Sequence, residues 1–208
     1  MDFRLFNDLF AFVLLICSKY GIDESHDISH SMNILNYAYN IYETEIYINP
    51  GIKEQRNIIL VSAILHDMCD KKYMNEEQGV ENIKDFLQEK INNEEINAIV
   101  KIMQTMSYSK VKKDGFPELG IYQKAYHIVR EADLLCAYDF DRCVIYDMKV
   151  NKNKLTGSIE HAEELFQNRV LRHNEDKLFT TEYAKAKYPE LHMQAIQRIK
   201  TWKSLIKK

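Results

Sequence analysis

The stretch Ile58-Ile59-Leu60-Val61-Ser62-Ala63-Ile64-Leu65-His66-Asp67 decides how this chain folds. Residues 58–65 are apolar on nearly every side of a helix, and a helix without a polar face belongs in the centre of a fold. An ionisable pair follows directly, at His66 and Asp67. Burying such a pair costs several kcal/mol unless the two groups are paired or bind a metal ion. The stretch therefore predicts a central helix that ends in metal ligands.

Apolar residues at helical spacing continue on both sides of this stretch. Between residues 28 and 46 they recur every three or four positions, and Asn49-Pro50-Gly51 ends that helix. Ser29 and Ser158 are typical N-cap residues, and each is expected to cap the helix beside it. Pro189 is expected to kink or divide the last helix, because proline lacks a backbone N–H. The predicted helices cover about residues 3–20, 28–46, 53–65, 75–87, 93–103, 119–135, 137–150, 159–171 and 181–206.

The composition also favours an all-α fold. The chain has 208 residues, of which 46% are hydrophobic and 28% charged, as in ordinary globular proteins. Its 6 Gly and 3 Pro leave little material for the hairpins of an all-β fold. We therefore predict a single compact all-α domain over residues 1–208, with a core at about 22–150 on which the N-terminal and C-terminal helices pack. Residues 107–118 are predicted to be the longest irregular segment.

Charge, hydropathy and cysteine usage narrow the cellular setting. A net charge of -3 is unlike that of a nucleic-acid-binding protein, so no nucleic-acid partner is expected. The apolar run 9–17 is far shorter than the roughly 20 residues that cross a bilayer, so no membrane association is expected. The 4 cysteines form no CxxC pair and are expected to be reduced. These features predict a cytoplasmic protein.

Four of the polar residues form a recognisable pattern. His30, then His66-Asp67, then Asp133 resemble the H…HD…D signature of the HD-domain superfamily of metal-dependent phosphohydrolases. The resemblance spans about residues 22–205 and implies an HD-type helical domain.

The residues around the signature strengthen this resemblance. Residues 26–30 (HDISH) are similar to the HDxxH opening of the family, and residues 65–70 (LHDMCD) to its LHDxxD core. Residues 131–135 (EADLL) are similar to its third block, in which an Ala-Asp pair carries the last ligand. One position departs from the pattern: many members have Arg or Lys after the last Asp, where this chain has Leu134.

The resemblance implies that a divalent metal ion is held by His30, His66, Asp67 and Asp133. Two imidazoles and two carboxylates suit Mn, Mg, Co, Ni, Fe or Zn and do not choose among them. Such an ion lowers the pKa of bound water from about 15.7 towards about 7, and the resulting hydroxide can attack phosphorus. The family pattern gives Asp70, beside His66 and Asp67, a catalytic role in orienting or deprotonating the attacking water.

Substrate phosphates need donors near this cluster. Related enzymes often use an additional histidine or lysine, which points to His26 and Lys72. Tyr108 and Lys110 offer an aromatic face, a hydroxyl and an ammonium group to a nucleotide. Arg142 offers a fork-shaped contact to a phosphate. These five residues are the predicted substrate-binding residues.

We expect the chain to hydrolyse a phosphate ester or anhydride, and a nucleoside mono- or triphosphate is the expected substrate. Two alternatives stay open, a cyclic-nucleotide phosphodiesterase and a nucleotide-binding sensor that signals without turnover. A purely helical adaptor is a third class, and it would bind no metal. The expected partner is a small phosphorylated molecule, and a homodimer stays open.

Overall fold

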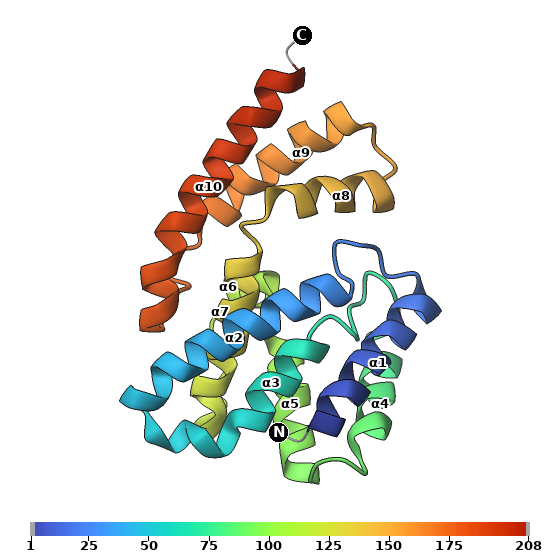
Figure 1. Cartoon of the computed structure of the whole chain (residues 1–208), viewed down its shortest axis with the longest axis vertical. Coiled ribbons are helices and arrows are strands. Elements are labelled where there is room, and N and C mark those ends of the chain that lie inside the picture. Colours follow the sequence, from blue (N-terminus) through green and yellow to red (C-terminus); the bar gives the residue numbers. More distant parts are fainter. Residues whose placement is uncertain (1–2, 207–208) are drawn as a thin grey trace.

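The computed structural model describes residues 3–206, which form ten α-helices and three short 3-10 helices with no strand among them (Figure 1). This confirms the predicted all-α fold. The ends of the predicted domain, residues 1–2 and 207–208, lie outside the described residues. No described helix is long and apolar enough to cross a membrane. In chain order the helices are α1 (Phe3–Tyr20), α2 (Ile28–Ile48), η1 (Pro50–Gln55), α3 (Arg56–Leu65), α4 (Glu76–Leu87), α5 (Asn93–Thr105), α6 (Tyr108–Asp114), η2 (Gly120–Tyr122), α7 (Gln123–Cys136), α8 (Phe140–Val150), α9 (Leu155–Asn168), η3 (Val170–Arg172) and α10 (Glu182–Ile206).

Helix α3 lies at the centre of the fold because it is apolar on all sides. Every residue from Ile58 to Leu65 is buried, and α1, α2, α5 and α7 pack around them. Burial of each side chain of leucine or isoleucine size contributes roughly 1.5–3 kcal/mol. The prediction of a central helix is confirmed, although its first turns, predicted from residue 53, belong to the 3-10 helix η1.

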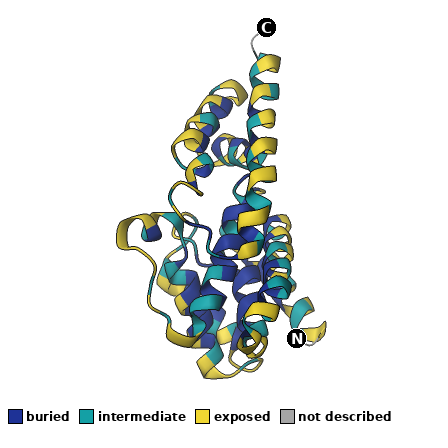
Figure 2. Cartoon of the chain, turned by 90° about the vertical axis from the view of Figure 1, so that its left-hand side faces the viewer, coloured by how far each residue is buried: buried dark blue, intermediate teal, exposed yellow. Residues whose placement is uncertain are grey.

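Helices α8, α9 and α10 form the upper part of the molecule in Figure 1, and α1 to α7 form the lower part. Helices α8 and α9 pack on each other, with the rings of Phe140 and Phe166 5.2 Å apart. Helix α10 contacts α8 and α9 above and α2 and α7 below, so it joins the two parts. Buried residues gather on the inner faces of the lower helices, whereas the last turns of α10 are largely exposed (Figure 2).

Two predicted helix caps are wrong. Asp27, rather than Ser29, caps α2, since an Asp27 carboxylate oxygen accepts from the backbone N–H of Ser29 at 2.9 Å. Helix α9 begins at Leu155, so Ser158 lies buried inside it. Gly157 also lies inside this helix. Its cost of about 1 kcal/mol in a helix is small beside the packing of α9 on α8.

The predicted irregular segment 107–118 and the predicted division of the last helix at Pro189 are also wrong. The segment predicted as irregular contains α6, which the Ser107 side chain caps and Gly115 ends at a φ of 79°. Pro189 lies inside α10 without dividing it. Both Pro189 and Lys185, whose carbonyl loses its helical partner, are exposed. Water can therefore satisfy that carbonyl, and the helix continues.

A buried carboxylate on α7 anchors the segment that leads into α10. Glu131 is fully buried. Its Oε1 accepts from the backbone N–H and the hydroxyl of Thr180 at 2.8 and 2.6 Å. Its Oε2 accepts from the same two groups of Thr181 at 2.9 and 2.7 Å. Arg130 adds a guanidinium donor at 3.2 Å. This carboxylate therefore fixes how the C-terminal helix approaches the core.

Replacement of Glu131 tests this anchor. Glu131→Gln removes the charge and turns an amide donor toward other donors, so we expect a loss of roughly 3–5 kcal/mol in the free energy of unfolding. Urea denaturation followed by circular dichroism measures it. Glu175→Gln, at an exposed position in the same region, is the matched control and should change stability by less than about 0.5 kcal/mol. Equal effects of the two substitutions would contradict the anchor.

Candidate functional site

Three helices bring the predicted metal ligands together. His30 lies in the first turn of α2, His66 and Asp67 directly follow α3, and Asp133 lies in the last turn of α7. Helix α2 packs along both α3 and α7. The site therefore forms where the start of one helix meets the ends of two others.

The turn that follows α3 is held closely by α4. A Cβ atom on Gly79 of α4 would lie only 2.7 Å from Cβ of Cys69 in this turn. Glycine at this position lets α4 approach the turn without a clash. The backbone next to His66 and Asp67 is thereby fixed from outside the cluster.

The four side chains form one compact cluster. The Nε2 atoms of His30 and His66 are 3.2 Å apart. Oδ2 of Asp67 lies 3.3 Å from Nε2 of His30 and 3.0 Å from Nε2 of His66. Oδ1 of Asp133 lies 3.8 Å from Nε2 of His30. One ligand atom each of His30, His66 and Asp133 lie within 4.8 Å of one another. The structure therefore brings together all four residues of the signature.

The two histidines of the cluster are buried and the two aspartates half-buried, and the four groups shift one another's protonation. Burial opposes a charge on His66, but the carboxylates of Asp67 and Asp133 raise its pKa to about 9. Burial also opposes ionisation of Asp67, yet the charge of His66 and the close imidazole of His30 hold its pKa well below the ordinary value. Burial lowers the pKa of His30. At neutral pH the two carboxylates are therefore ionised and His66 holds a proton, so the cluster already contains one cationic partner.

The donor atoms of this cluster are of the types that bind divalent cations. Oδ2 of Asp67 is shielded from solvent and has no hydrogen-bond partner in the described part of the chain. Nδ1 of His66 lies 3.0 Å from the carbonyl of Ala63. Because a carbonyl only accepts, Nδ1 donates to it and Nε2 is left to face the other ligands, as in metal-binding histidines. The residues present thus fit a metal ion.

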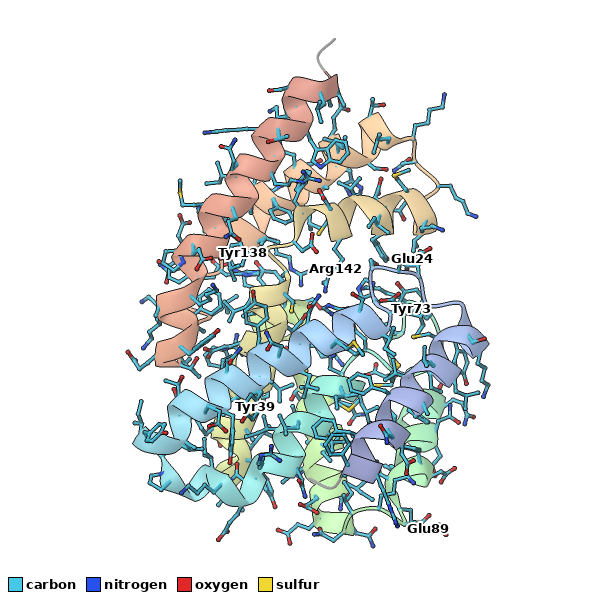
Figure 3. The ribbon with its side chains drawn as sticks, viewed as in Figure 1. Glu24, Tyr39, Tyr73, Glu89, Tyr138 and Arg142 are labelled. Atoms are coloured by element: carbon cyan, nitrogen blue, oxygen red, sulfur yellow. The ribbon has the colours of Figure 1, made fainter. Side chains whose placement is uncertain are left out.

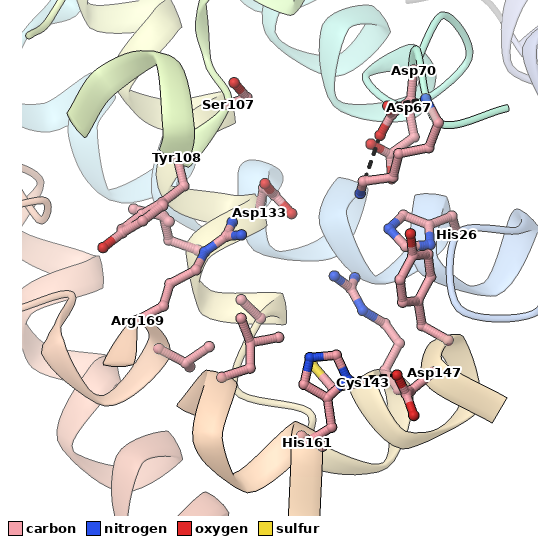
Figure 4. Close-up of a pocket in the computed structure, with 18 residues that line it drawn as sticks. His26, Asp67, Asp70, Ser107, Tyr108, Asp133, Cys143, Asp147, His161 and Arg169 are labelled. Carbon is pink, nitrogen blue, oxygen red and sulfur yellow. Dashed lines mark hydrogen bonds and ion pairs between the residues drawn. The ribbon is translucent and has the colours of Figure 1, made fainter. Parts of the chain in front are cut away.

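A cavity of about 360 Å³, here called the main cavity, opens beside the cluster between the lower helices and α8–α9 (Figure 4). Asp67 and Asp133 line it, while His30 and His66 line neighbouring hollows. Its volume is at the small end of the range for small-molecule sites. One wall is apolar and comes from α7, α9 and their adjoining turns: Leu134, Ala137, Ala162, Leu165 and Val170.

Of the predicted substrate-binding residues, His26 lines the main cavity but is neutral at pH 7. Its Nδ1 lies 2.6 Å from the hydroxyl of Ser25 and 3.0 Å from that of Tyr73, which donates to Asp23. Tyr73 reaches this histidine from beside the loop between α1 and α2 (Figure 3). Burial lowers the pKa of His26 to about 4. His26 can therefore offer a phosphate one hydrogen bond and no charge.

Asp70 and Lys72 face the main cavity from the turn after α3. Helix α3 ends at Leu65, so Asp70 does not follow Asp67 along a continuous helix. Asp70 instead accepts from the backbone N–H of Lys72 at 2.9 Å and pairs with its ammonium at 3.3 Å. That ammonium also lies 5.4 Å from the centre of the Tyr146 ring.

The remaining three predicted substrate-binding residues differ in placement. Tyr108 lines the main cavity. Lys110 lines only the hollow beside His66, and its ammonium is engaged by Glu76 at 3.1 Å and by the carbonyl of Gln104 at 2.6 Å. Arg142 extends from α8 toward α2 (Figure 3). Its Nη1 contacts the ring of His30, 2.8 Å from Nε2.

Four further residues of the main cavity were not found from the sequence. Arg169 lies at the end of α9, Tyr146 and Asp147 lie on α8, and His161 lies on α9. Asp147 is buried and accepts from Nδ1 of His161 at 2.6 Å. Spacing along the sequence does not reveal the Asp147–His161 pair. Its members lie on separate helices, and their contact depends on how α8 and α9 pack.

Comparison with known proteins supports the fold. No protein-family model matches the chain, and no curated protein matches it. A crystal structure of a structural-genomics target from Lactobacillus plantarum is similar, with a TM-score of 0.71 and 17% sequence identity. The similarity covers 98% of this chain and 97% of that chain. The whole arrangement of helices is therefore one that an experimentally solved protein also adopts.

Behind the cavity wall lies a histidine that is buried without hydrogen bonds. His173 is fully buried, and neither ring nitrogen has a partner among the described residues. Its ring packs on Tyr108 and Tyr138, with centroids 5.7 Å away in each case. Burial, reinforced by the charge of Arg169, lowers the pKa of His173 to about 3. This ring is therefore neutral in the folded state and supports Tyr108 through packing.

The burial of His173 should make the stability of the chain depend on pH. Between the folded pKa of about 3 and an unfolded value of about 6.5, the unfolded chain binds a proton at His173 that the folded chain does not, so stability falls as pH falls. His173→Phe removes this contribution. We expect the variant to gain about 2 kcal/mol relative to the parent chain between pH 7 and pH 5, measured by urea denaturation. A stability difference that stays constant across this pH range would contradict the assignment.

Proposed function

We propose that the chain is a metal-dependent phosphohydrolase of the HD type that acts on a phosphorylated small molecule, specifically a nucleotide. One observation carries the proposal: a compact cluster of two buried histidines and two half-buried aspartates adjoins a cavity that holds guanidinium groups without carboxylate partners. Among the described residues, neither Arg142 nor Arg169 has a carboxylate within ion-pair distance, and both line the main cavity. A cavity with metal ligands at one end and unpaired cations beside them suits a phosphate group.

In this proposal the divalent ion is held by His30, His66, Asp67 and Asp133. When bound, it supplies a nucleophile by lowering the pKa of water and neutralises charge on the phosphate. The ligand types suit Mn, Mg, Co, Ni, Fe and Zn alike.

The other residues bind and orient the substrate. Arg142 contacts His30 and lines the main cavity, so its guanidinium can bind a phosphate there. Lys72 adds a further positive charge to the main cavity, and Asp70 beside it offers a carboxylate that can orient water. In the net reaction, water oxygen bonds to phosphorus, the bond from phosphorus to the substrate oxygen breaks, and that oxygen leaves with a proton.

The remaining lining of the main cavity supports a nucleotide as the substrate. Its apolar wall and the Tyr146 ring offer flat contact area for a base. The Asp147–His161 pair offers hydrogen-bonding atoms for sugar hydroxyls. A cytoplasmic location is part of the same proposal and is supported by four cysteines that form no disulfide.

Release of phosphate and pyrophosphate tests the proposed reaction. The purified chain is incubated with nucleoside mono-, di- and triphosphates in the presence of Mn²⁺, Mg²⁺, Co²⁺ or Ni²⁺. We expect turnover of at least one nucleotide, and a loss of at least about 1,000-fold in the His66→Ala, Asp67→Ala double variant, because several kcal/mol of transition-state stabilisation disappears. Asp85→Asn, an exposed carboxylate on α4, is the matched control and should keep full activity.

Two outcomes would contradict the proposal. Activity that survives in the double variant would come from another site or from a contaminant. A chain that binds metal and nucleotide but turns over none of the panel would be a sensor instead of a hydrolase.

A further inference from the structure

Arg169 differs from an ordinary surface arginine in the direction of its side chain. It follows the last residue of α9, and its side chain turns inward to line both the main cavity and the hollow beside His66. Figure 4 shows its guanidinium beside the ring of Tyr108 and directed toward Asp133. Asp133 is one of the four residues of the metal-ligand cluster. Arg169 therefore brings a positive charge to the cluster from α9, an element other than the one that carries Arg142.

An aromatic platform fixes the direction of this side chain. Cζ of Arg169 lies 4.3 Å from the centre of the Tyr108 ring, a stacking distance. The Tyr108 hydroxyl donates to Oδ2 of Asp176 at 3.2 Å, and its ring packs against His173. Because the ring is held from two sides, the guanidinium is oriented before any ligand arrives, which reduces the entropy that binding has to remove.

The guanidinium has no anionic partner among the described residues. Its Nε is shielded from solvent and makes no hydrogen bond. Burial lowers the pKa of Arg169, and Asp133 opposes that shift only through space. The neighbouring Arg172, by contrast, is exposed and pairs with Glu175 at 3.6 Å. A largely buried cation without a partner is costly unless an anion completes the site.

We propose that Arg169, supported by Tyr108, binds the phosphate group of the substrate. The inference rests on the proposed function, since it assigns the anion that this site takes. A guanidinium matches two oxygens of a phosphate through its fork of N–H donors, which an ammonium cannot do. Arg142 and Arg169 then contact one phosphate from α8 and from the end of α9, and Tyr108 is a positioning residue.

The affinity for inorganic phosphate tests this assignment independently of turnover. Isothermal titration calorimetry measures phosphate binding to the chain in the presence of Mg²⁺, and metal binding is measured separately on each variant. We expect Arg169→Met to weaken phosphate binding by about 10- to 100-fold and Arg169→Lys by a smaller factor, because one or two charge-assisted hydrogen bonds are lost. Metal affinity should stay within about twofold. Arg172→Met is the matched control and should bind phosphate like the parent chain.

The platform has its own pair of variants. Tyr108→Phe keeps the stacked ring and loses only the hydroxyl, so phosphate affinity should stay within about twofold. Tyr108→Leu removes the ring and should weaken phosphate binding by about 3- to 10-fold. Circular dichroism verifies that each variant is folded. If Arg169→Met does not fold, Arg169→Lys and Tyr108→Leu keep the test decisive.

The outcomes separate this inference from the proposed function. Unchanged phosphate affinity in the folded Arg169 variants, an equal loss in Arg172→Met, or no phosphate binding by the parent chain would overturn the assignment. Phosphate binding that depends on Arg169 in a chain without hydrolase activity would keep the assignment and reject the hydrolase. Hydrolase activity of the parent chain, together with unchanged phosphate affinity in Arg169→Met, would reject the assignment and keep the hydrolase.

Discussion

The structure depends on one electrostatic constraint, the packing of two half-buried aspartates against two buried histidines at the end of the central helix. A lone carboxylate at the depth of Asp67 would be protonated or exposed. Here the rings of His30 and His66 lie within 3.3 Å of its Oδ2 and keep it ionised. The groups stabilise one another only while α2, α3 and α7 stay in register, so the requirements of the cluster and of the fold coincide.

The hydrophobic core sets that register. Helix α3 is buried on every side, and the helices that carry His30 and Asp133 pack directly on it. On the other side of α7, Glu131 holds the segment that leads into α10. Two carboxylates of α7 therefore have different roles. Glu131 joins the upper part of the molecule to the lower part, and Asp133 faces the cavity between them.

The sequence was sufficient to predict the central helix and its cluster, and insufficient to predict the residues that surround the cavity. The apolar run before His66 predicted the buried helix, and the histidine and aspartate positions predicted a cluster that the structure does assemble. Residues placed by packing between distant helices were missed, Arg169 above all, because its environment depends on Tyr108 and on how α9 ends. Local errors such as the cap at Ser29 arose where two neighbouring residues compete for one role, and geometry favours Asp27.

Direct metal binding tests the central claim, that the buried cluster is a cation site. Electron paramagnetic resonance of Mn²⁺ titrated into the metal-free chain counts bound ions and gives their affinity. We predict one ion per chain, lost or weakened by at least about 100-fold in Asp67→Asn and His30→Gln and unchanged in the exposed control Asp85→Asn. The account would be contradicted if the parent chain bound none of the divalent metal ions tested. It would also be contradicted if folded Asp67→Asn bound the ion as tightly as the parent chain.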